Sequence, residues 1–174
     1  GIGNRAGTTA TNGEDDGHGF TGQSSGSVYT ALLVNVASSQ TTGDYFFHFF
    51  DGPITGNIFR GRVFLKKDAT TTNYAFGIQF GSNINTVYTP FSYATGTTHL
   101  LVVKYTYNPL AADDQVSLFV DPFPSCNEPT ATVSAVDALQ PDATSLGAVG
   151  VRHTFRPAGG PALLFTNVIR DPGS

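Results

Sequence analysis

The chain has 174 residues, which is enough for one domain with a substantial buried core. About 40% of the residues are apolar but only 13% are charged, against roughly 25% in a typical soluble domain. The net charge of −4, with nine basic residues scattered along the chain, argues against a nucleic-acid partner, and no apolar run approaches the roughly 20 residues of a membrane span.

The first segment, residues 1–13, is polar and rich in glycine (GIGNRAGTTATNG), which predicts an N-terminal arm or an edge strand. The chain contains no Met, so we expect a processed mature chain or an excerpt of a longer one. Its many Thr, Ser, Gly and Phe residues and few Lys residues favour an extracellular or cell-surface protein. The next segment, DDGHGF, places His18 beside Asp15 and Asp16, where we expect a solvated turn, with cation binding as the alternative.

Alternation of apolar residues with a period of two predicts strands from residue 27 onward. The predicted strands are residues 27–36, 44–50, 61–67, 73–80, 99–107, 115–121, 146–155 and 162–170. Clusters of Gly, Asn, Asp, Pro and Thr between them predict turns. The strands over 99–107 and 115–121 are joined by the polar segment NPLAADD, so we expect them to be neighbours in one wall of a sandwich.

The same period assigns side chains to faces. In the first strand it places five residues on one face: Val28, Thr30, Leu32, Val34 and Val36. In 44–50 it places Tyr45, Phe47 and Phe49 on one side and Phe46, His48 and Phe50 on the other. The region 121–145 lacks this alternation and is expected to be a surface excursion. Within it, SAVDALQ permits one helical turn, with Ser134 as its cap and Pro141 beyond its end.

So many Phe residues on both faces of the strands cannot be left against water by a single flat sheet. We therefore expect an all-β fold of two antiparallel sheets packed face to face. About ten strands fit a jelly roll better than a seven-stranded immunoglobulin sandwich. No change in composition marks a boundary, so residues 1–174 are expected to form a single β-sandwich domain.

The order of these segments resembles the laminin-G-like, concanavalin A-like jelly-roll modules of secreted bacterial proteins. The resemblance lies in TGTTHLLVVKY, VSLFVDP and FTNVIRD, which stand where those modules have "gttyLvVvkY", "vsLwvnP" and "iDeIRv" strands. It covers nearly the whole chain, but Phe119 stands in place of the usual Trp, and Thr166 and Asn167 in place of the usual acidic pair. The resemblance implies a jelly-roll fold rather than a function, because this fold hosts many functions.

The sequence predicts that the protein is not an enzyme. Glycoside hydrolysis needs two carboxyl groups about 5 to 9 Å apart across a cleft. The only two Glu residues, Glu14 and Glu128, lie in turn-like segments, and the adjacent Asp113 and Asp114 lie in a loop, where we expect them to point apart. The chain has no G-x-S-x-G elbow, and His48, His99 and His153 are expected to be strand residues rather than catalytic bases.

No cofactor is expected, with calcium as the alternative. Calcium takes six to eight oxygen ligands, and NGEDDG offers oxygens at a tight turn to which Asp44, Asp51 or Asp171 could add. The single Cys126 in PSCNEP cannot form an internal disulfide. We expect a free thiol on a loop, with a covalent link to a second chain as the alternative.

Two functions fit a weakly charged sandwich without catalytic groups. The first is a structural protein that associates with copies of itself through sheet edges or its N-terminal arm and builds a surface assembly or filament. Most candidate edges lack blocking charges, because only Lys66 and Lys67 stand together in a strand-like segment. The second is a carbohydrate-binding, lectin-like module that holds a polysaccharide with its Tyr and Asn residues, although sequence alone assigns no residue to such a site.

Overall fold

The structure is a computed structural model that describes residues 6–8, 16–81, 85–152 and 162–169. In this part of the chain, twelve strands form two six-stranded sheets and no residue is helical. The first sheet contains, in spatial order, β1 (Ala6–Thr8), β12 (Ala162–Ile169), β3 (Ser27–Ser38), β8 (Thr98–Thr106), β9 (Gln115–Val120) and β10 (Val133–Val136). The second sheet contains β2 (Asp16–Gln23), β11 (Leu146–Val151), β4 (Asp44–Asp51), β5 (Phe59–Lys67), β6 (Tyr74–Gln79) and β7 (Val87–Tyr88).

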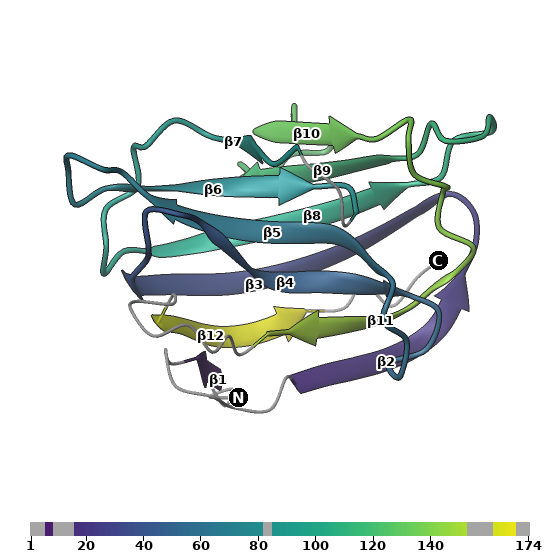
Figure 1. Cartoon of the computed structure of the whole chain (residues 1–174), viewed down its shortest axis with the longest axis horizontal. Coiled ribbons are helices and arrows are strands. Elements are labelled where there is room, and N and C mark those ends of the chain that lie inside the picture. The colour runs from purple at the N-terminus through teal and green to yellow at the C-terminus, as the bar shows by residue number, and fades with distance from the viewer. Residues whose placement is uncertain (1–5, 9–15, 82–84, 153–161, 170–174) are drawn as a thin grey trace.

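The two sheets lie face to face, with the second sheet toward the viewer in Figure 1. Neighbouring strands pair antiparallel throughout both sheets. The chain passes repeatedly from one sheet to the other, for example from β2 to β3 to β4 and from β10 to β11 to β12. The predicted all-β, two-sheet antiparallel sandwich is therefore confirmed.

The core lies between the sheets and is built from the predicted apolar faces. All five side chains assigned to one face of β3 are buried. Strands β8 and β9 pair from Leu101 with Val120 to Thr106 with Gln115, so the two strands around NPLAADD are neighbours as predicted. Their inward residues meet those of the second sheet in one cluster, which includes Val103, Leu118, Val63, Phe76 and Ile78.

The face assignment within β4 is wrong at its first two positions. The pairing of β4 with β5 shifts register between Tyr45 and Phe47 and again between Phe47 and Phe49. Such irregularities re-aim side chains. Tyr45 consequently lies on the outer face of the sheet, with its ring centroid 5.8 Å from that of His48. Phe46, which was predicted to lie on the side opposite Phe47 and Phe49, instead joins them in the core.

Three strands were not predicted. Strand β2 reads DGHGFTGQ, and its side chains other than Phe20 are exposed, so no apolar alternation marks it. It pairs with β11 through the backbone, and His18 therefore lies in an exposed edge strand rather than in a turn. The two-residue β7 is too short to leave a pattern in the sequence.

The third unpredicted strand, β10, replaces the expected helical turn. Residues 133–136 pair with β9, and the Ser134 hydroxyl lies 2.8 Å from that of Ser117 across the ladder. Pairing with a neighbouring strand outweighs the local helical preference of this short segment. Outside β10, residues 121–145 contain no strand, as predicted.

The N-terminal segment is described only in part. Within residues 1–13, Ala6–Thr8 form β1, an edge strand that pairs with β12 of the same chain. The remainder of that segment lies outside the described residues.

Truncating a core side chain should be far more costly than truncating an exposed one. Leu118 is fully buried, so Leu118→Ala should lower the free energy of unfolding by about 2 to 5 kcal/mol. Leu139 is 82% exposed, so the matched Leu139→Ala variant should change it by no more than about 0.5 kcal/mol. Urea unfolding of the three proteins measures both values, and equal losses would contradict this assignment of the core.

Candidate functional site

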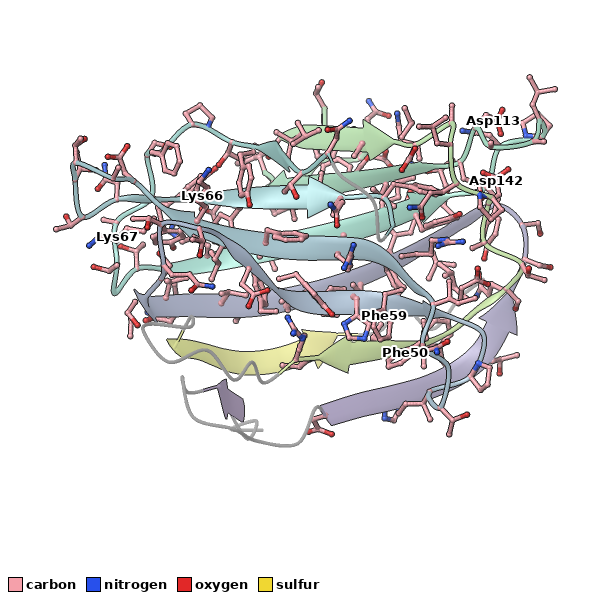
Figure 2. The ribbon with its side chains drawn as sticks, viewed as in Figure 1. Phe50, Phe59, Lys66, Lys67, Asp113 and Asp142 are labelled. Carbon is pink, nitrogen blue, oxygen red and sulfur yellow. The ribbon has the colours of Figure 1, made fainter. Side chains whose placement is uncertain are left out.

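The outer face of the second sheet carries an unusual number of aromatic rings. An antiparallel sheet that covers a core normally turns polar side chains toward water. Here β4, β5 and β7 turn six rings outward, which we call the aromatic face: Tyr45, His48, Phe50, Phe59, Phe64 and Tyr88. Figure 2 shows Phe50 and Phe59 on the side of the sheet that faces the viewer. Of these rings, His48 and Phe50 are buried, and the other four are half-buried.

Three cations lie over these rings. The guanidinium carbons of Arg152 and Arg62 lie 4.3 Å and 4.9 Å from the centroid of Tyr45, so both contact its ring. The Lys66 ammonium lies 5.4 Å from the centroid of Tyr88. These are cation–π distances, and the rings hold the charges at the surface of the sheet.

Only one of the three cations forms an ion pair within the described part of the chain. Arg152 pairs with the Asp44 carboxylate at 3.0 Å. Arg62 donates from Nε and Nη2 to the Gly81 carbonyl, and no ion pair involves Lys66. Burial lowers the pKa of Arg62, but a guanidinium remains protonated at neutral pH. The aromatic face is therefore positively charged.

His48 lies beneath this surface and has no polar partner among the described residues. It is 1% exposed, and neither ring nitrogen forms a hydrogen bond. Its ring packs against Phe59 and Phe50, with centroids 4.1 Å and 4.7 Å away. On its other side it contacts Gly150, where an added Cβ would lie 2.6 Å from Nε2. Glycine at this position therefore makes the room for the imidazole.

Burial lowers the pKa of His48 from 6.5 to about 4, with smaller contributions from the positive charges of Arg62 and Arg152. The unfolded chain therefore takes up this proton at a higher pH than the folded chain does. The stability that the neutral ring contributes is complete above about pH 6.5 and is lost as the pH falls toward 4.

Replacing His48 should remove this part of the acid sensitivity. The shift corresponds to about 3 kcal/mol, so the wild-type free energy of unfolding should fall by that order between pH 6.5 and 4. His48→Phe should flatten the decline, whereas a control His18→Gln variant, which changes an exposed histidine, should keep it. Denaturant unfolding at a series of pH values makes the comparison, and an unchanged decline in His48→Phe would refute the role of His48.

A second cluster lies in the loop between β8 and β9 and in the segment before β11. Asp113, Asp114 and Asp142, which we call the acidic corner, have carboxylate oxygens within 4.8 Å of one another. The expectation that adjacent Asp113 and Asp114 point apart is therefore wrong. Figure 2 shows Asp113 and Asp142 together at one end of the sandwich, away from Phe59.

Hydrogen bonds to the carboxylates explain why these acids converge. The buried Asp114 accepts from the Tyr105 hydroxyl at 2.6 Å and from the Asn108 amide at 2.7 Å. Asp142 accepts from the amides of Ala112 and Asp114 at 2.7 Å and 3.0 Å. Ala112 has a φ of +57°, which is costly for a residue with a Cβ, and the bond to Asp142 helps to hold it. The three acids therefore hold the backbone of the loop in place through hydrogen bonds.

This cluster is the only group of three or more potential metal ligands among the described residues. Carboxylates suit calcium, so these are the residues that could hold a cation. The residues named for calcium from the sequence do not form such a group in the described part of the chain. Asp44 is paired with Arg152, and Asp51 with the buried Arg60 at 3.3 Å. Glu14, Asp15 and Asp171 lie outside the described residues.

The remaining histidines are strand residues where they are described. His99 is buried in β8 and bonds through Nδ1 to the Asp121 carboxylate at 2.6 Å. Its Nε2 lies among Tyr74, Phe76 and Tyr93 and has no hydrogen-bond partner in the part of the chain that the structure describes. His153 lies outside the described residues.

Glu128 and Cys126 belong to the segment that follows β9. The Glu128 carboxylate bonds to the Lys104 ammonium at 2.8 Å and to the Tyr29 hydroxyl. These bonds tie the segment to the outer face of the first sheet. Cys126 is exposed and forms no internal disulfide.

A shallow depression lies beside the free edge of the second sheet. It has a volume of about 840 Å³ and is lined by residues 19–22 of β2, residues 52–54, Ser145 and Gly147. Four of the nine lining residues are glycine and three are apolar, so the hydroxyls of Thr21 and Ser145 are the only polar side-chain groups in this lining. None of the residues that line the depression has a side chain suited to acid–base chemistry.

From the sequence, no residue was assigned to a site on the aromatic face or in the acidic corner. The aromatic face depends on the register of β4 against β5, and Asp142 meets Asp113 only because the segment before β11 returns beside the loop. The density of aromatic residues in DYFFHFF was the available signal, since one strand cannot bury all of them.

No protein-family model matches this chain, and no curated protein matches it. Within the described residues, no helix has the length and apolarity needed to cross a bilayer.

Proposed function

We propose that this protein is a non-catalytic structural protein of the cell surface or extracellular space that associates with copies of itself into an assembly or filament. We also propose that the chain is a module of the laminin-G-like kind found in secreted proteins, as the resemblance of its sequence implies. The observation that carries it is the position of β2 at the edge of the second sheet, where β11 is the strand that it pairs with among the described residues.

Strand β2 has the features of an edge that can pair. It is eight residues long, and Asp16 is its only charged residue besides the titratable His18. Natural edge strands are usually blocked by Lys, Pro or a cover, because unpaired backbone groups recruit other strands. Lys66 and Lys67 do not serve that purpose, since β5 lies inside the sheet between β4 and β6. The edge strand β10 of the first sheet also exposes Val136, which is 58% accessible.

Charges placed on β2 should weaken association. The double variant Thr21→Lys and Gln23→Lys puts two cations on exposed edge positions, and we expect at least a tenfold weaker self-association. Thr72→Lys, in the exposed turn before β6, adds charge away from this edge and should have little effect. Sedimentation velocity over a range of concentrations measures the change. A wild-type chain that remains monomeric at every concentration would disprove the proposed function.

The aromatic face favours a second candidate function, carbohydrate binding. Partly exposed rings such as Phe59 and Phe64 offer apolar surfaces on which sugar rings can stack, and the neighbouring Arg62 can donate hydrogen bonds to hydroxyl groups. This candidate needs no catalytic group and agrees with the same extracellular setting.

Removing a ring tests the second candidate. If the face binds glycans, Phe59→Ala should reduce retardation by polysaccharides in affinity gel electrophoresis severalfold. Phe91→Ala removes a ring that is 37% exposed and lies outside the aromatic face, so it should leave retardation unchanged. Equal retardation of the wild type and Phe59→Ala on every retained polysaccharide would exclude this face as the glycan site.

A further inference from the structure

We infer that the Phe59 ring is a lid over His48 that opens in acid while the core of the sandwich stays folded. The opening exposes apolar surface on the second sheet, so the aromatic face contains a pH-sensitive switch. This switch goes beyond the proposed function, because it operates whether or not the chain assembles or binds a glycan.

The surroundings of His48 suit only a neutral imidazole. The residue is 1% exposed, and neither ring nitrogen has a hydrogen-bond partner among the described residues. Phe59 and Phe50 pack against the ring, with centroids 4.1 Å and 4.7 Å away, and Gly150 of β11 lies against Nε2. An imidazolium has two N–H donors, and a buried charge without a partner is far more costly than the neutral ring. Protonation therefore requires that the ring reaches a polar partner, which water supplies once the cover opens.

The charged groups around His48 oppose its protonation. Burial lowers the pKa of the imidazole, and the positive charges of Arg62 on β5 and Arg152 after β11 add to this effect. From β4, Tyr45 contacts the ring edge to face, with centroids 5.8 Å apart. The carboxylate of Asp44, at the start of β4, is paired with Arg152 at 3.0 Å and balances that guanidinium. The β11 residue that contacts the ring is a glycine and adds no charge.

Phe59 is the part of this enclosure that can move with the least disruption. It is the first residue of β5 and is half-buried on the outward side of the sheet, whereas Phe50 is buried (Figure 2). It directly follows a loop whose last residue, Ile58, is 51% exposed. The rings of His48, Phe50 and Phe59 do not belong to the buried cluster between the sheets. Rotation of the Phe59 side chain therefore uncovers the imidazole without breaking core contacts, as in local openings of other proteins.

The direction of the pH effect follows from the two forms of His48. In the open form the hydrated ring has a pKa near the ordinary value of 6.5, whereas in the closed form the pKa is about 4. The open form therefore takes up a proton at a higher pH, and acid draws the population toward it. The opening equilibrium is unchanged above about pH 6.5 and shifts by roughly 100-fold as the pH falls to 4.

Dye binding by the full-length chain tests the acid step. The dye ANS fluoresces on exposed apolar surface, so its fluorescence on the wild type should be about threefold higher at pH 4 than at pH 7. The far-UV circular dichroism should not change, because the strands remain paired. His48→Phe has no group to protonate at this position and should show no such rise. The control His18→Gln, which changes an exposed histidine, should behave as the wild type does.

A steric change should open the lid at neutral pH. A Cβ at Gly150 would lie 2.6 Å from Nε2 of His48, so Gly150→Ala should push the imidazole toward Phe59. We expect this variant to bind ANS at pH 7 as strongly as the wild type does at pH 4. Gly19→Ala is the matched control, because a Cβ there meets its nearest atom at 3.9 Å. Combining His48→Ala with Gly150→Ala removes the clash and should restore the low ANS signal.

Three results would overturn the inference. A wild type whose ANS signal stays constant in acid, or rises only together with loss of the strand signal, would show that no local opening occurs. An equal rise in the wild type and His48→Phe would show that His48 does not control the surface. A Gly150→Ala variant that is folded and binds no more ANS at pH 7 than Gly19→Ala would show that the imidazole does not support the lid. A wild-type chain that opens in acid but never assembles would refute the proposed self-association alone.

Discussion

A strand with a ring at every position cannot bury all of them between two sheets, and this constraint shapes the whole molecule. Residues 45–50 of β4 are Tyr, Phe, Phe, His, Phe and Phe. Successive side chains in a strand point to opposite faces, so one set fills the core and the other stands outside it. The bulged pairing of β4 with β5 turns three of the rings inward and leaves Tyr45, His48 and Phe50 on the outer face.

The outer rings in turn determine the environment of His48. Phe50 and Phe59 cover its imidazole, Gly150 leaves room for it, and two guanidinium groups lie close enough to oppose its protonation. A neutral, unpartnered histidine is tolerated in such a place because an uncharged imidazole is less costly to bury than a charged one. The same rings keep Arg62 and Arg152 at the surface, so a face made of apolar side chains acquires a positive charge.

The acidic corner has a different physical cause. The loop after β8 turns sharply at Ala112 and returns to β9, which leaves backbone amides that strand pairing cannot satisfy. Carboxylates accept from those amides, and Asp142 reaches them from a distant part of the sequence. The arrangement stabilises the loop locally and brings three carboxylates within 4.8 Å of one another.

The amino-acid pattern alone determined the all-β fold, the two-sheet packing, the buried face of β3 and the adjacency of β8 and β9. These features depend on period-two alternation and short connections, which are local. The tertiary structure alone decided the rest. Strand β2 exists through backbone pairing with β11, and β10 through pairing with β9, although neither sequence alternates clearly. The face of Tyr45 depends on the register of a neighbouring strand, and the approach of Asp142 to Asp113 depends on a chain return. Each of these features is fixed by contacts between residues far apart in the sequence, which local periodicity does not encode.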